Sequence, residues 1–305
     1  MLKTDMENKK SLVGAWVEAA RPRTLPASVS PVLLGCALAY YDGAFDVVPA
    51  VLCLLVALFA QIASNFANDY FDFKKGADRE DRLGPERAVA EGWITPKAML
   101  TGTFVTLGLA CAVGLLLVCF ADWRLIGVGI AIAICVLAYS AGPFPLAYNG
   151  LGDVCVLLFY GVIPVCFTYY IQTLNFSLLS FLLSVALGLL SVNILIVNNY
   201  RDYEQDKAAR KRTTIVLFGR RAGRVFYVLN ECMAFLLVLP LILDAPWWIL
   251  FLFGILFALC FYTTRELFTL EGRALNRTLG HTARNVFLFA SVLSLLFLYI
   301  GGVSN

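Results

Sequence analysis

The chain is poor in charged residues and contains a single histidine. Charged residues make up 15% of its 305 residues, and His281 is the only histidine. Soluble globular domains carry about 25% charged residues, whereas 60% of this chain is hydrophobic and its mean hydropathy is +0.78. The composition argues against an ordinary soluble domain and predicts an all-α protein whose helices cross a membrane several times.

The cysteines lack the spacing of a metal site. All nine stand singly among apolar residues: Cys36, Cys53, Cys111, Cys119, Cys135, Cys155, Cys166, Cys232 and Cys260. Such scattered thiols are typical of packing residues rather than zinc ligands.

The N-terminal segment lacks the features of a cleavable signal. Residues 1–10 are polar, and the apolar run after Arg21-Pro22-Arg23 is too long for a signal core, so we expect the first helix to stay as an anchor. Before it, residues 1–20 are expected to form an interfacial segment. Its apolar face recurs at helical spacing through Leu12, Val13, Trp16 and Val17.

Apolar runs of about 20 residues, the length that crosses a hydrocarbon layer of about 30 Å, predict nine transmembrane helices. Their approximate ranges are 24–41, 49–67, 98–119, 124–141, 153–171, 177–198, 223–243, 247–264 and 282–302. Short breaks with Gly, Pro or charge separate them. We expect one integral membrane domain over residues 1–305.

Basic residues are almost absent from one side of this topology. Of the 24 Lys and Arg residues only Arg124 falls there. The others lie in the N-terminal segment and in residues 68–97, 200–224 and 265–284. The positive-inside bias therefore places the N-terminus and these loops in the cytoplasm, in a multi-pass protein of the inner (cytoplasmic) membrane. Membrane lipid is the expected surrounding, and no nucleic-acid partner is expected.

Two acidic motifs stand where long apolar segments end. Asn68-Asp69-Tyr70-Phe71-Asp72 and Asn198-Asn199-Tyr200-Arg201-Asp202 share the pattern Asn-x-Tyr-x-Asp. A carboxylate at hydrocarbon depth costs about 2.5–3.5 kcal/mol on insertion scales. Acidic residues at these two positions therefore indicate a cation, a substrate or a proton path.

The spacing within the motifs favours a site for a metal ion and a diphosphate. If each helix continues past the membrane edge, Asn68 and Asp72 lie one turn apart on one face, and Asn198, Asp202 and Asp206 repeat the arrangement. Mg²⁺ is usually held by one or two carboxylates with phosphate oxygens and water. A solvated loop, or one that binds anionic lipid, explains the neighbouring cations but not the ordered Asn and Asp spacing.

The two motifs lie on the same predicted side of the membrane, at 65–87 and 198–212, which suggests one shared polar chamber. Ionising an allylic diphosphate requires neutralisation of the leaving group, and apolar walls must keep water from the carbocation. The 23 Phe, 13 Tyr and 5 Trp residues supply ample material for such walls.

These residues resemble the UbiA superfamily of intramembrane prenyltransferases. NDYFDFKKGAD and NNYRDYEQDKAARKRT are similar to its two aspartate-rich motifs. Further stretches resemble the branch that prenylates 1,4-dihydroxy-2-naphthoate in menaquinone biosynthesis: RPRTLPASVSPVLL at 21–34, DRLGPER at 81–87, YSAGPFPLAYNGLGD at 139–153 and TYYIQ at 168–172. The resemblance spans nearly the whole chain and implies a nine-helix bundle whose chamber opens to the cytoplasm and sideways to lipid.

The resemblance also implies an activity and roles for individual residues. A polyprenyl group would pass from polyprenyl diphosphate to the aromatic acid, with loss of carbon dioxide, giving demethylmenaquinol and diphosphate. Mg²⁺ would be held by Asn68, Asp69, Asp72, Asn198, Asp202 and Asp206, with Asn68, Asp72, Asp202 and Asp206 also expected to be catalytic. Diphosphate partners would be Arg21, Lys75, Arg82, Arg87, Lys207 and Arg212, and substrate contacts would come from Tyr139 and Asp153.

Two residues do not fit the motif simply. Asp78 lies six residues after Asp72, where many members of the superfamily have a carboxylate four residues after, so Asp78 is assigned to the loop or the aromatic substrate. His281 is a candidate general base as the only imidazole. Its place beside Thr282 near a helix entrance favours capping or an interfacial hydrogen bond instead.

Two alternatives remain open on the sequence. Another aromatic acceptor, such as 4-hydroxybenzoate or homogentisate, would leave the diphosphate chemistry unchanged. An ion-coupled transporter also buries carboxylates in broken helices. Mg²⁺-dependent release of diphosphate separates an enzyme from a transporter.

Overall fold

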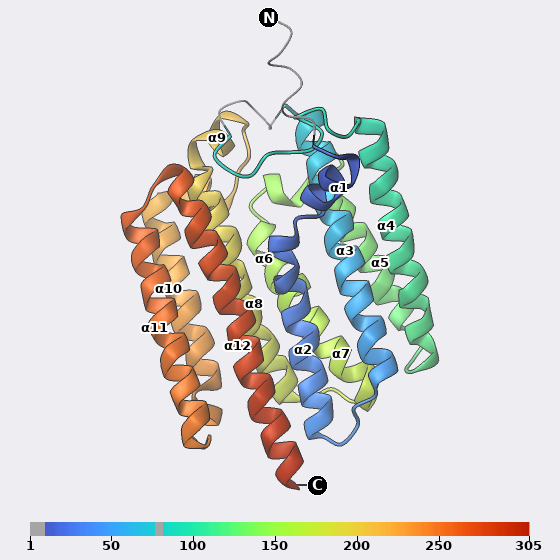
Figure 1. Ribbon diagram of the computed structural model, residues 1–305, viewed down its shortest axis with the longest axis vertical. Helices are drawn as coiled ribbons and strands as arrows, with labels where there is room; N and C mark the ends of the chain where they lie inside the picture. Colours follow the sequence, from blue (N-terminus) through green and yellow to red (C-terminus); the bar gives the residue numbers. More distant parts are fainter. Residues whose placement is uncertain (1–9, 77–81, 305) are drawn as a thin grey trace, which may run out of the picture.

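The computed structural model describes residues 10–76 and 82–304, which form an all-α bundle of upright helices (Figure 1). The elements that cross the bundle are α2 (Leu25–Tyr41), α3 (Val47–Lys74), α4 (Pro96–Leu116), α5 (Leu125–Ala138), α8 (Leu178–Arg201), α10 (Thr214–Leu243), α11 (Trp247–Thr269), α12 (Leu275–Ser304) and a broken helix made of α6 (Gly152–Leu157), η4 (Leu158–Val162) and α7 (Ile163–Thr173). Shorter elements are α1 (Leu12–Ala20), η1 (Pro22–Thr24), η2 (Leu117–Cys119), η3 (Leu146–Tyr148), α9 (Tyr203–Ala208) and η5 (Gly272–Ala274). The expected fold class is confirmed.

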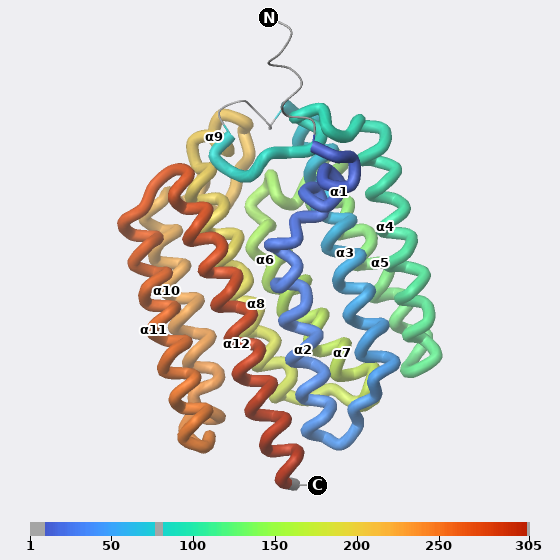
Figure 2. The backbone as a smooth tube through the Cα atoms, in the orientation of Figure 1, coloured from blue at the N-terminus to red at the C-terminus, as the bar shows by residue number. Residues whose placement is uncertain are grey.

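One end of the bundle carries the predicted cytoplasmic loops. We call it the charged end; it holds α1, α9 and the loops formed by residues 82–95, 139–151 and 202–213 (Figure 1). Residues 82–95 run across this end from the side of α9 to the start of α4 (Figure 2). The C-terminus lies at the opposite end. The loops expected on one face of the membrane are therefore gathered at one end of the molecule.

Eight helical segments in the described part of the chain are long and apolar enough to cross a membrane, the first being α1 with α2. The expected span at 124–141 is shorter. Helix α5 has 14 residues, which is about 21 Å of helix against a hydrocarbon layer of about 30 Å. The chain nevertheless returns through α5 toward the charged end before it enters α6 (Figure 1).

Several helices extend beyond their expected limits at the charged end. Helix α3 continues to Lys74, so Asn68 and Asp72 lie one turn apart in a continuous helix, as predicted. The second motif differs, because α8 ends at Arg201 and α9 begins at Tyr203. Asn198, Asp202 and Asp206 are nevertheless still one helical turn apart. The Asp202 amide donates to Asn198 O at 3.0 Å, and the Asp206 amide donates to Asp202 O at 2.8 Å.

The bundle is packed on one side and hollow on the other. The largest core cluster joins α2, α7, α8, α10, α11 and α12 through side chains such as Leu34, Leu187 and Phe289, each fully buried. On the other side, α2 to α7 enclose a space whose far end is closed by a second cluster: Val32, Cys53, Leu117, Leu125 and Ile171. The chamber therefore opens at the charged end and is sealed opposite it.

Helix α1 only partly matches its expected interfacial role. Leu12, Val13 and Val17 are 67%, 74% and 51% exposed, and form the apolar outer face that the sequence predicts. Trp16 instead turns inward, and its ring contacts Phe66 edge-on at 5.2 Å between centroids. The helix is anchored to α3 by this contact.

A π-helical turn, η4, breaks the helix that begins at α6. Pro164 has no N–H to donate to the carbonyl of Tyr160 four residues earlier, and its ring crowds that carbonyl, so the backbone widens by one residue. Gly161 lies against Gly188 of α8, where an added Cβ would stand 2.5 Å from the Gly188 Cα and from the Ser184 carbonyl oxygen. This contact fixes how far η4 approaches α8.

We expect Gly161→Ala to destabilise the protein by about 1–3 kcal/mol, because the new methyl group meets backbone atoms that cannot rotate away. The measurement is the midpoint of thermal unfolding in detergent. Gly254→Ala is the matched control, since a Cβ there meets nothing within 4 Å. Equal midpoints for the two variants would contradict the close contact.

Candidate functional site

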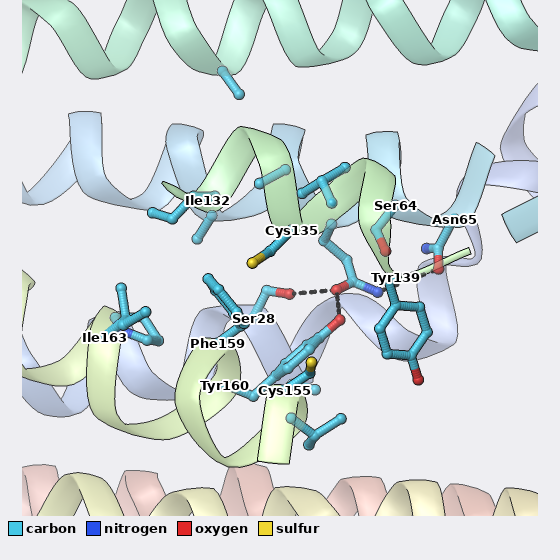
Figure 3. Close-up of a pocket in the computed structure, with 18 of the residues that line it drawn as sticks. Ser28, Ser64, Asn65, Ile132, Cys135, Tyr139, Cys155, Phe159, Tyr160 and Ile163 are labelled. Atoms are coloured by element: carbon cyan, nitrogen blue, oxygen red, sulfur yellow. Dashed lines mark hydrogen bonds between the residues drawn. The ribbon is translucent and has the colours of Figure 1, made fainter. Parts of the chain in front are cut away.

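A cavity of about 640 Å³ descends from the charged end into the bundle. Near that end it is lined by charged and polar side chains: Arg21, Asn68, Asp72, Arg82, Arg87, Asn198, Arg201 and Lys211. Further in, the walls are mostly apolar, and Ile132 and Cys135 of α5 face Phe159, Tyr160 and Ile163 across the space (Figure 3). A ligand with a charged head and a long apolar body suits this division.

Asp72 is held by two donors at the mouth of the cavity. The Tyr148 hydroxyl donates to its Oδ1 at 2.9 Å, and an Arg87 guanidinium nitrogen lies 3.2 Å from its Oδ2. Two cations stack on the Tyr148 ring, with Lys75 Nζ 4.2 Å and Lys211 Nζ 5.3 Å from its centroid. Tyr148 thus joins the two motifs, and sequence reasoning missed it although it lies within YSAGPFPLAYNGLGD.

Neighbouring residues Asn68 and Asp69 point to different places. Asn68 lines the cavity, and its Oδ1 accepts from the Ser140 hydroxyl. Asp69 is 2% exposed, and its two oxygens accept the backbone N–H groups of Ala88 and Val89 at 3.0 and 3.1 Å. Because both oxygens hold the 82–95 loop, the structure assigns Asp69 to anchoring that loop and not to the metal site expected from the sequence.

Arg201 organises the second motif from a fully buried position, 1% exposed. It donates to both oxygens of Asp202 at 2.7 and 2.6 Å, to Asn198 Oδ1 at 2.8 Å and to Asn276 Oδ1 at 2.7 Å. Asn276 in turn donates to the Leu83 carbonyl at 2.9 Å. A single guanidinium therefore connects α8, α12 and the loop over the cavity, a role that its neighbours in the sequence did not reveal.

Asp206 pairs with Lys211, which lines the cavity, whereas Asp202 and Asp206 lie just behind its lining. Lys211 Nζ lies 3.8 Å from Asp206 Oδ1, while Asp206 Oδ2 is buried and has no hydrogen-bond partner among the described residues. Burial, together with the charges of Asp202 and Asp72, raises the pKa of Asp206 to about 6 although Lys211 opposes this. Burial disfavours the charged form of Lys211, but Asp206, Asp72 and Asp202 outweigh it and raise its pKa.

The structure corrects which cations face the cavity. Lys207 and Arg212, expected as diphosphate partners, are exposed and do not line it. Lys211 does, because Arg210 adopts a left-handed conformation with φ of 55° after α9 ends, and the Lys211 amide then donates back to Asp206 O at 2.8 Å. The sequence of basic residues does not show that the chain turns back at Arg210.

The remaining predicted site residues lie where the sequence placed them or close by. Arg21, Arg82, Arg87, Tyr139 and Asp153 line the cavity. Lys75 is outside the lining, and its Nζ donates to the Ser140 carbonyl at 2.6 Å. Asp78 and Asp81 lie outside the described residues.

Magnesium fits the donors at the cavity mouth. In the part of the chain that is described, no three His, Cys, Asp or Glu side chains are grouped closely enough to hold a metal by themselves. One or two carboxylates completed by oxygens of a bound phosphate are typical of Mg²⁺. The buried, unpartnered Asp206 Oδ2 and its raised pKa mark a carboxylate that lacks enough positive charge.

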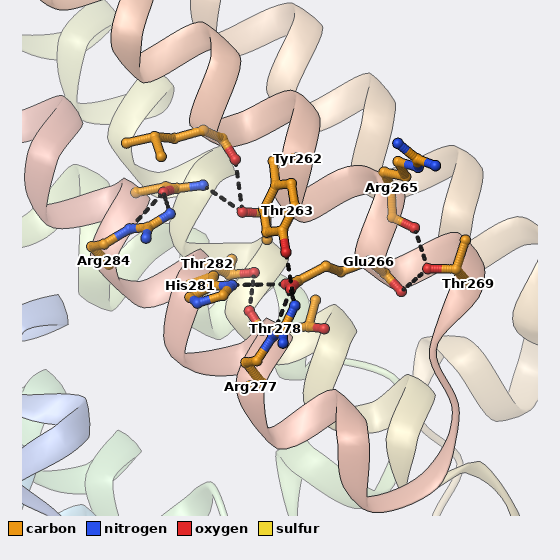
Figure 4. A network of polar contacts seen from close by, with 12 residues as sticks. Tyr262, Thr263, Arg265, Glu266, Thr269, Arg277, Thr278, His281, Thr282 and Arg284 are labelled. Atoms are coloured by element: carbon orange, nitrogen blue, oxygen red, sulfur yellow. Dashed lines mark hydrogen bonds and ion pairs between the residues drawn. The ribbon is translucent and has the colours of Figure 1, made fainter.

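His281 lies outside the cavity lining, in a polar network between α11 and α12 (Figure 4). Its Nδ1 is 2.8 Å from Glu266 Oε2, and Arg277 Nε donates to Glu266 Oε1 at 2.8 Å. The sequence predicts capping or an interfacial hydrogen bond for His281; the structure shows a hydrogen bond between two helices, and the position gives no support to a general base in the chamber.

Residues 28–291 match the family model described as the UbiA prenyltransferase family. The chain is 37% identical to 1,4-dihydroxy-2-naphthoate octaprenyltransferase of Haemophilus influenzae, over 73% of this chain and 76% of that protein. It is 37% identical to the protein of the same name from Escherichia coli, over 72% and 74%.

Solved structures share the fold. A UbiA homolog from Archaeoglobus fulgidus bound to DMAPP and Mg²⁺ superimposes with a TM-score of 0.65 at 18% identity, over 92% of this chain and 99% of that one. The apo structure of a UbiA homolog from Aeropyrum pernix K1 gives a TM-score of 0.67 at 15% identity, over 89% and 97%.

We expect Lys211→Ala to weaken binding of inorganic diphosphate at least tenfold. Charge-assisted hydrogen bonds are worth about 1.5–3 kcal/mol, and removal of Lys211 leaves Asp206 and Asp72 to repel the anion. Lys207→Ala, which removes an exposed cation four residues away, should change binding less than twofold. Isothermal titration of both variants makes the comparison, and similar losses would contradict the assignment of Lys211 to the cavity.

Proposed function

The chain belongs to the UbiA prenyltransferase family, and we propose that it transfers a polyprenyl group from polyprenyl diphosphate to 1,4-dihydroxy-2-naphthoate. The observation that carries this proposal is the cavity, in which a mouth of carboxylates and cations leads into an apolar chamber. The relatives at 37% identity, named for this acceptor, support it over other aromatic acceptors. They equally disfavour an ion-coupled transporter.

The diphosphate is bound by the cations at the cavity mouth. Arg21, Arg82, Arg87 and Lys211 line it, and Lys75 is linked to it through Tyr148. Arg and Lys provide charge-assisted hydrogen bonds to phosphate oxygens. Residues 82–95 cross this end of the bundle (Figure 2), and by covering the site they limit the access of water to the reacting carbon.

Mg²⁺ would be held by side-chain oxygens of Asn68, Asp72, Asn198, Asp202 and Asp206. Arg201 occupies both oxygens of Asp202, and Tyr148 and Arg87 occupy those of Asp72. Asp206, with one oxygen that has no partner among the described residues, is therefore the carboxylate most readily offered to a cation. When bound, Mg²⁺ neutralises charge on the diphosphate as the leaving group departs. Tyr148 and Arg87 orient the Asp72 carboxylate at the cavity mouth.

The reaction is an electrophilic aromatic substitution. The bond between the allylic carbon and the diphosphate oxygen breaks with its electron pair going to diphosphate, and a ring carbon forms a new bond to the allylic carbon. The carboxylate leaves as carbon dioxide and the electron pair of its C–C bond stays with the ring, so the prenyl group replaces the carboxylate with no net loss of a proton, which gives demethylmenaquinol and diphosphate. The apolar and aromatic lining, including Phe159, Tyr160 and Phe167, keeps water from the electrophile.

The protein acts as one catalytic domain in the cytoplasmic membrane. The gathering of basic loops at the charged end supports a cytoplasmic opening by the positive-inside bias. At the opposite end, Trp123 and Trp247 are 71% and 78% exposed, as expected of aromatic residues at a membrane interface. The apolar outer faces of the helices between these ends contact lipid.

Asp72→Asn should reduce turnover at least ~100-fold, which corresponds to the loss of ~3 kcal/mol of transition-state stabilisation. The amide cannot neutralise a cation and disturbs the contacts to Arg87 and Tyr148. Initial rates with geranyl diphosphate and the naphthoate, measured across a Mg²⁺ titration, provide the readout. Asp122→Asn at the opposite end is the control. Near-normal rates for Asp72→Asn at saturating Mg²⁺ would contradict the metal-site proposal.

Carboxyl-labelled 1,4-dihydroxy-2-naphthoate should lose its label in step with product formation, because the ring carboxylate leaves as carbon dioxide. Released label and prenylated product are counted in the same reaction. A prenylated product that retains the label would instead favour a hydroxybenzoate-type reaction.

A further inference from the structure

A second polar cluster lies inside the chamber, apart from the diphosphate site. Gln61 of α3 accepts hydrogen bonds at its Oε1 from the hydroxyls of Ser28, at 3.2 Å, and Tyr160 (Figure 3). Its amide nitrogen donates to Asn65 Oδ1 at 3.3 Å and to Thr24 Oγ1 at 3.4 Å. All of these residues line the cavity. The cluster therefore offers hydroxyl and amide groups to whatever occupies the chamber.

The depth of the cluster separates it from the metal and diphosphate. Gln61 precedes Asn68 by seven residues on α3, which is about 10 Å along the axis at 1.5 Å per residue. A diphosphate seated between Asp72 and Lys211 cannot reach this level. Substrate atoms that lie deeper in the chamber than the diphosphate can reach the cluster.

The cluster also divides the chamber into a polar and an apolar side. Its members come from η1, α2, α3 and η4, whereas the lining from α4 and α5 is largely aliphatic, for example Leu115, Ile126 and Ile130. A polyprenyl chain offers no hydrogen-bond partner to the remaining lone pairs of these hydroxyl and amide groups, whereas a ring hydroxyl does. The aliphatic side therefore suits the prenyl chain, and the polar side suits the aromatic ring.

Local backbone geometry directs Tyr160 into this cluster. Tyr160 stands in the middle of the π-turn η4, whose approach to α8 is fixed by the Gly161–Gly188 contact. Such π-turns are frequent at functional sites. The Tyr160 hydroxyl donates to Gln61, and its oxygen keeps lone pairs that accept a hydrogen bond from a phenolic O–H.

We propose that Tyr160, supported by Gln61, forms the subsite for the ring hydroxyl farthest from the carboxylate of the aromatic acceptor. This inference rests on the proposed function. The acceptor carboxylate stays toward the cationic mouth of the cavity, because a charge is costly to move deeper. Of the two hydroxyls, the 4-hydroxyl, meta to the carboxylate, lies farther from it than the 1-hydroxyl; it therefore reaches further into the chamber and meets Tyr160. The residue determines acceptor specificity by fixing the ring at this end.

Tyr160→Phe removes only the hydroxyl. We expect the KM for 1,4-dihydroxy-2-naphthoate to rise about tenfold, as for one lost hydrogen bond to a buried partner, with the KM for geranyl diphosphate within twofold of wild type. Tyr169→Phe is the matched control. Tyr169 is also buried and donates to a carboxylate, Asp42, but lies outside the cavity lining, so both KM values should stay within twofold.

A substrate analogue tests the hydroxyl directly. 1-Hydroxy-2-naphthoate keeps the carboxylate and lacks the 4-hydroxyl, so its inhibition constants against wild type and Tyr160→Phe should agree within twofold. An unchanged acceptor KM in Tyr160→Phe overturns the subsite, as does an equal loss for acceptor and analogue. A lowered unfolding temperature with both substrate KM values raised together also overturns it, because that pattern indicates packing alone. If the wild-type enzyme does not turn over the naphthoate, the proposed function itself is refuted. If only the Tyr160→Phe comparison fails, the subsite alone is refuted.

Discussion

The cost of placing charge beside hydrocarbon governs the whole charged end of this protein. A carboxylate or guanidinium there is tolerated only when it is paired, and the two Asn-x-Tyr-x-Asp motifs are built accordingly. Asp72 is held by Arg87 and Tyr148, and Asp202 by both prongs of the buried Arg201. Asp206 is the exception, with one oxygen buried and unpartnered among the described residues. We propose that a bound cation and diphosphate supply the partner that Asp206 lacks.

The hollow half of the bundle depends on rigid packing in the other half. Helices α2, α8 and α12 share one close-packed core, so the broken helix α6–η4–α7 can be held at a fixed distance from them. The Gly161–Gly188 contact sets that distance, and Pro164 accounts for the π-turn that accompanies it. The shape of the chamber therefore depends on how closely the backbones of η4 and α8 approach each other, which side-chain volumes alone do not predict.

The sequence predicted the helical spacing within the first acidic motif, but not which cations lie beside the cavity. Helical spacing correctly placed Asn68 and Asp72 on one face of α3, because a continuous helix has only one register. The same reasoning treated Asp69 as a neighbour in the site, although its adjacent position turns it to the other side of the helix, toward the 82–95 loop. Lys211 follows the end of α9, where no helical register predicts its direction, and it lines the cavity whereas Lys207 within α9 does not.

Composition and apolar runs by themselves determined the membrane class, the approximate spans and the clustering of charge on one side, since each depends on local sequence and on the thickness of a bilayer. The two acidic motifs and four further stretches carried the family resemblance. Only the tertiary structure decided which polar groups converge. Tyr148, Arg201 and Lys211 became site residues because loops fold back over helix ends, with Arg210 reversing the chain. Tyr160 reached Gln61 because a π-turn rotated it inward. Such encounters join residues as far apart as Leu83 and Asn276, which are separated by 193 positions, and depend on long-range packing that no local pattern encodes.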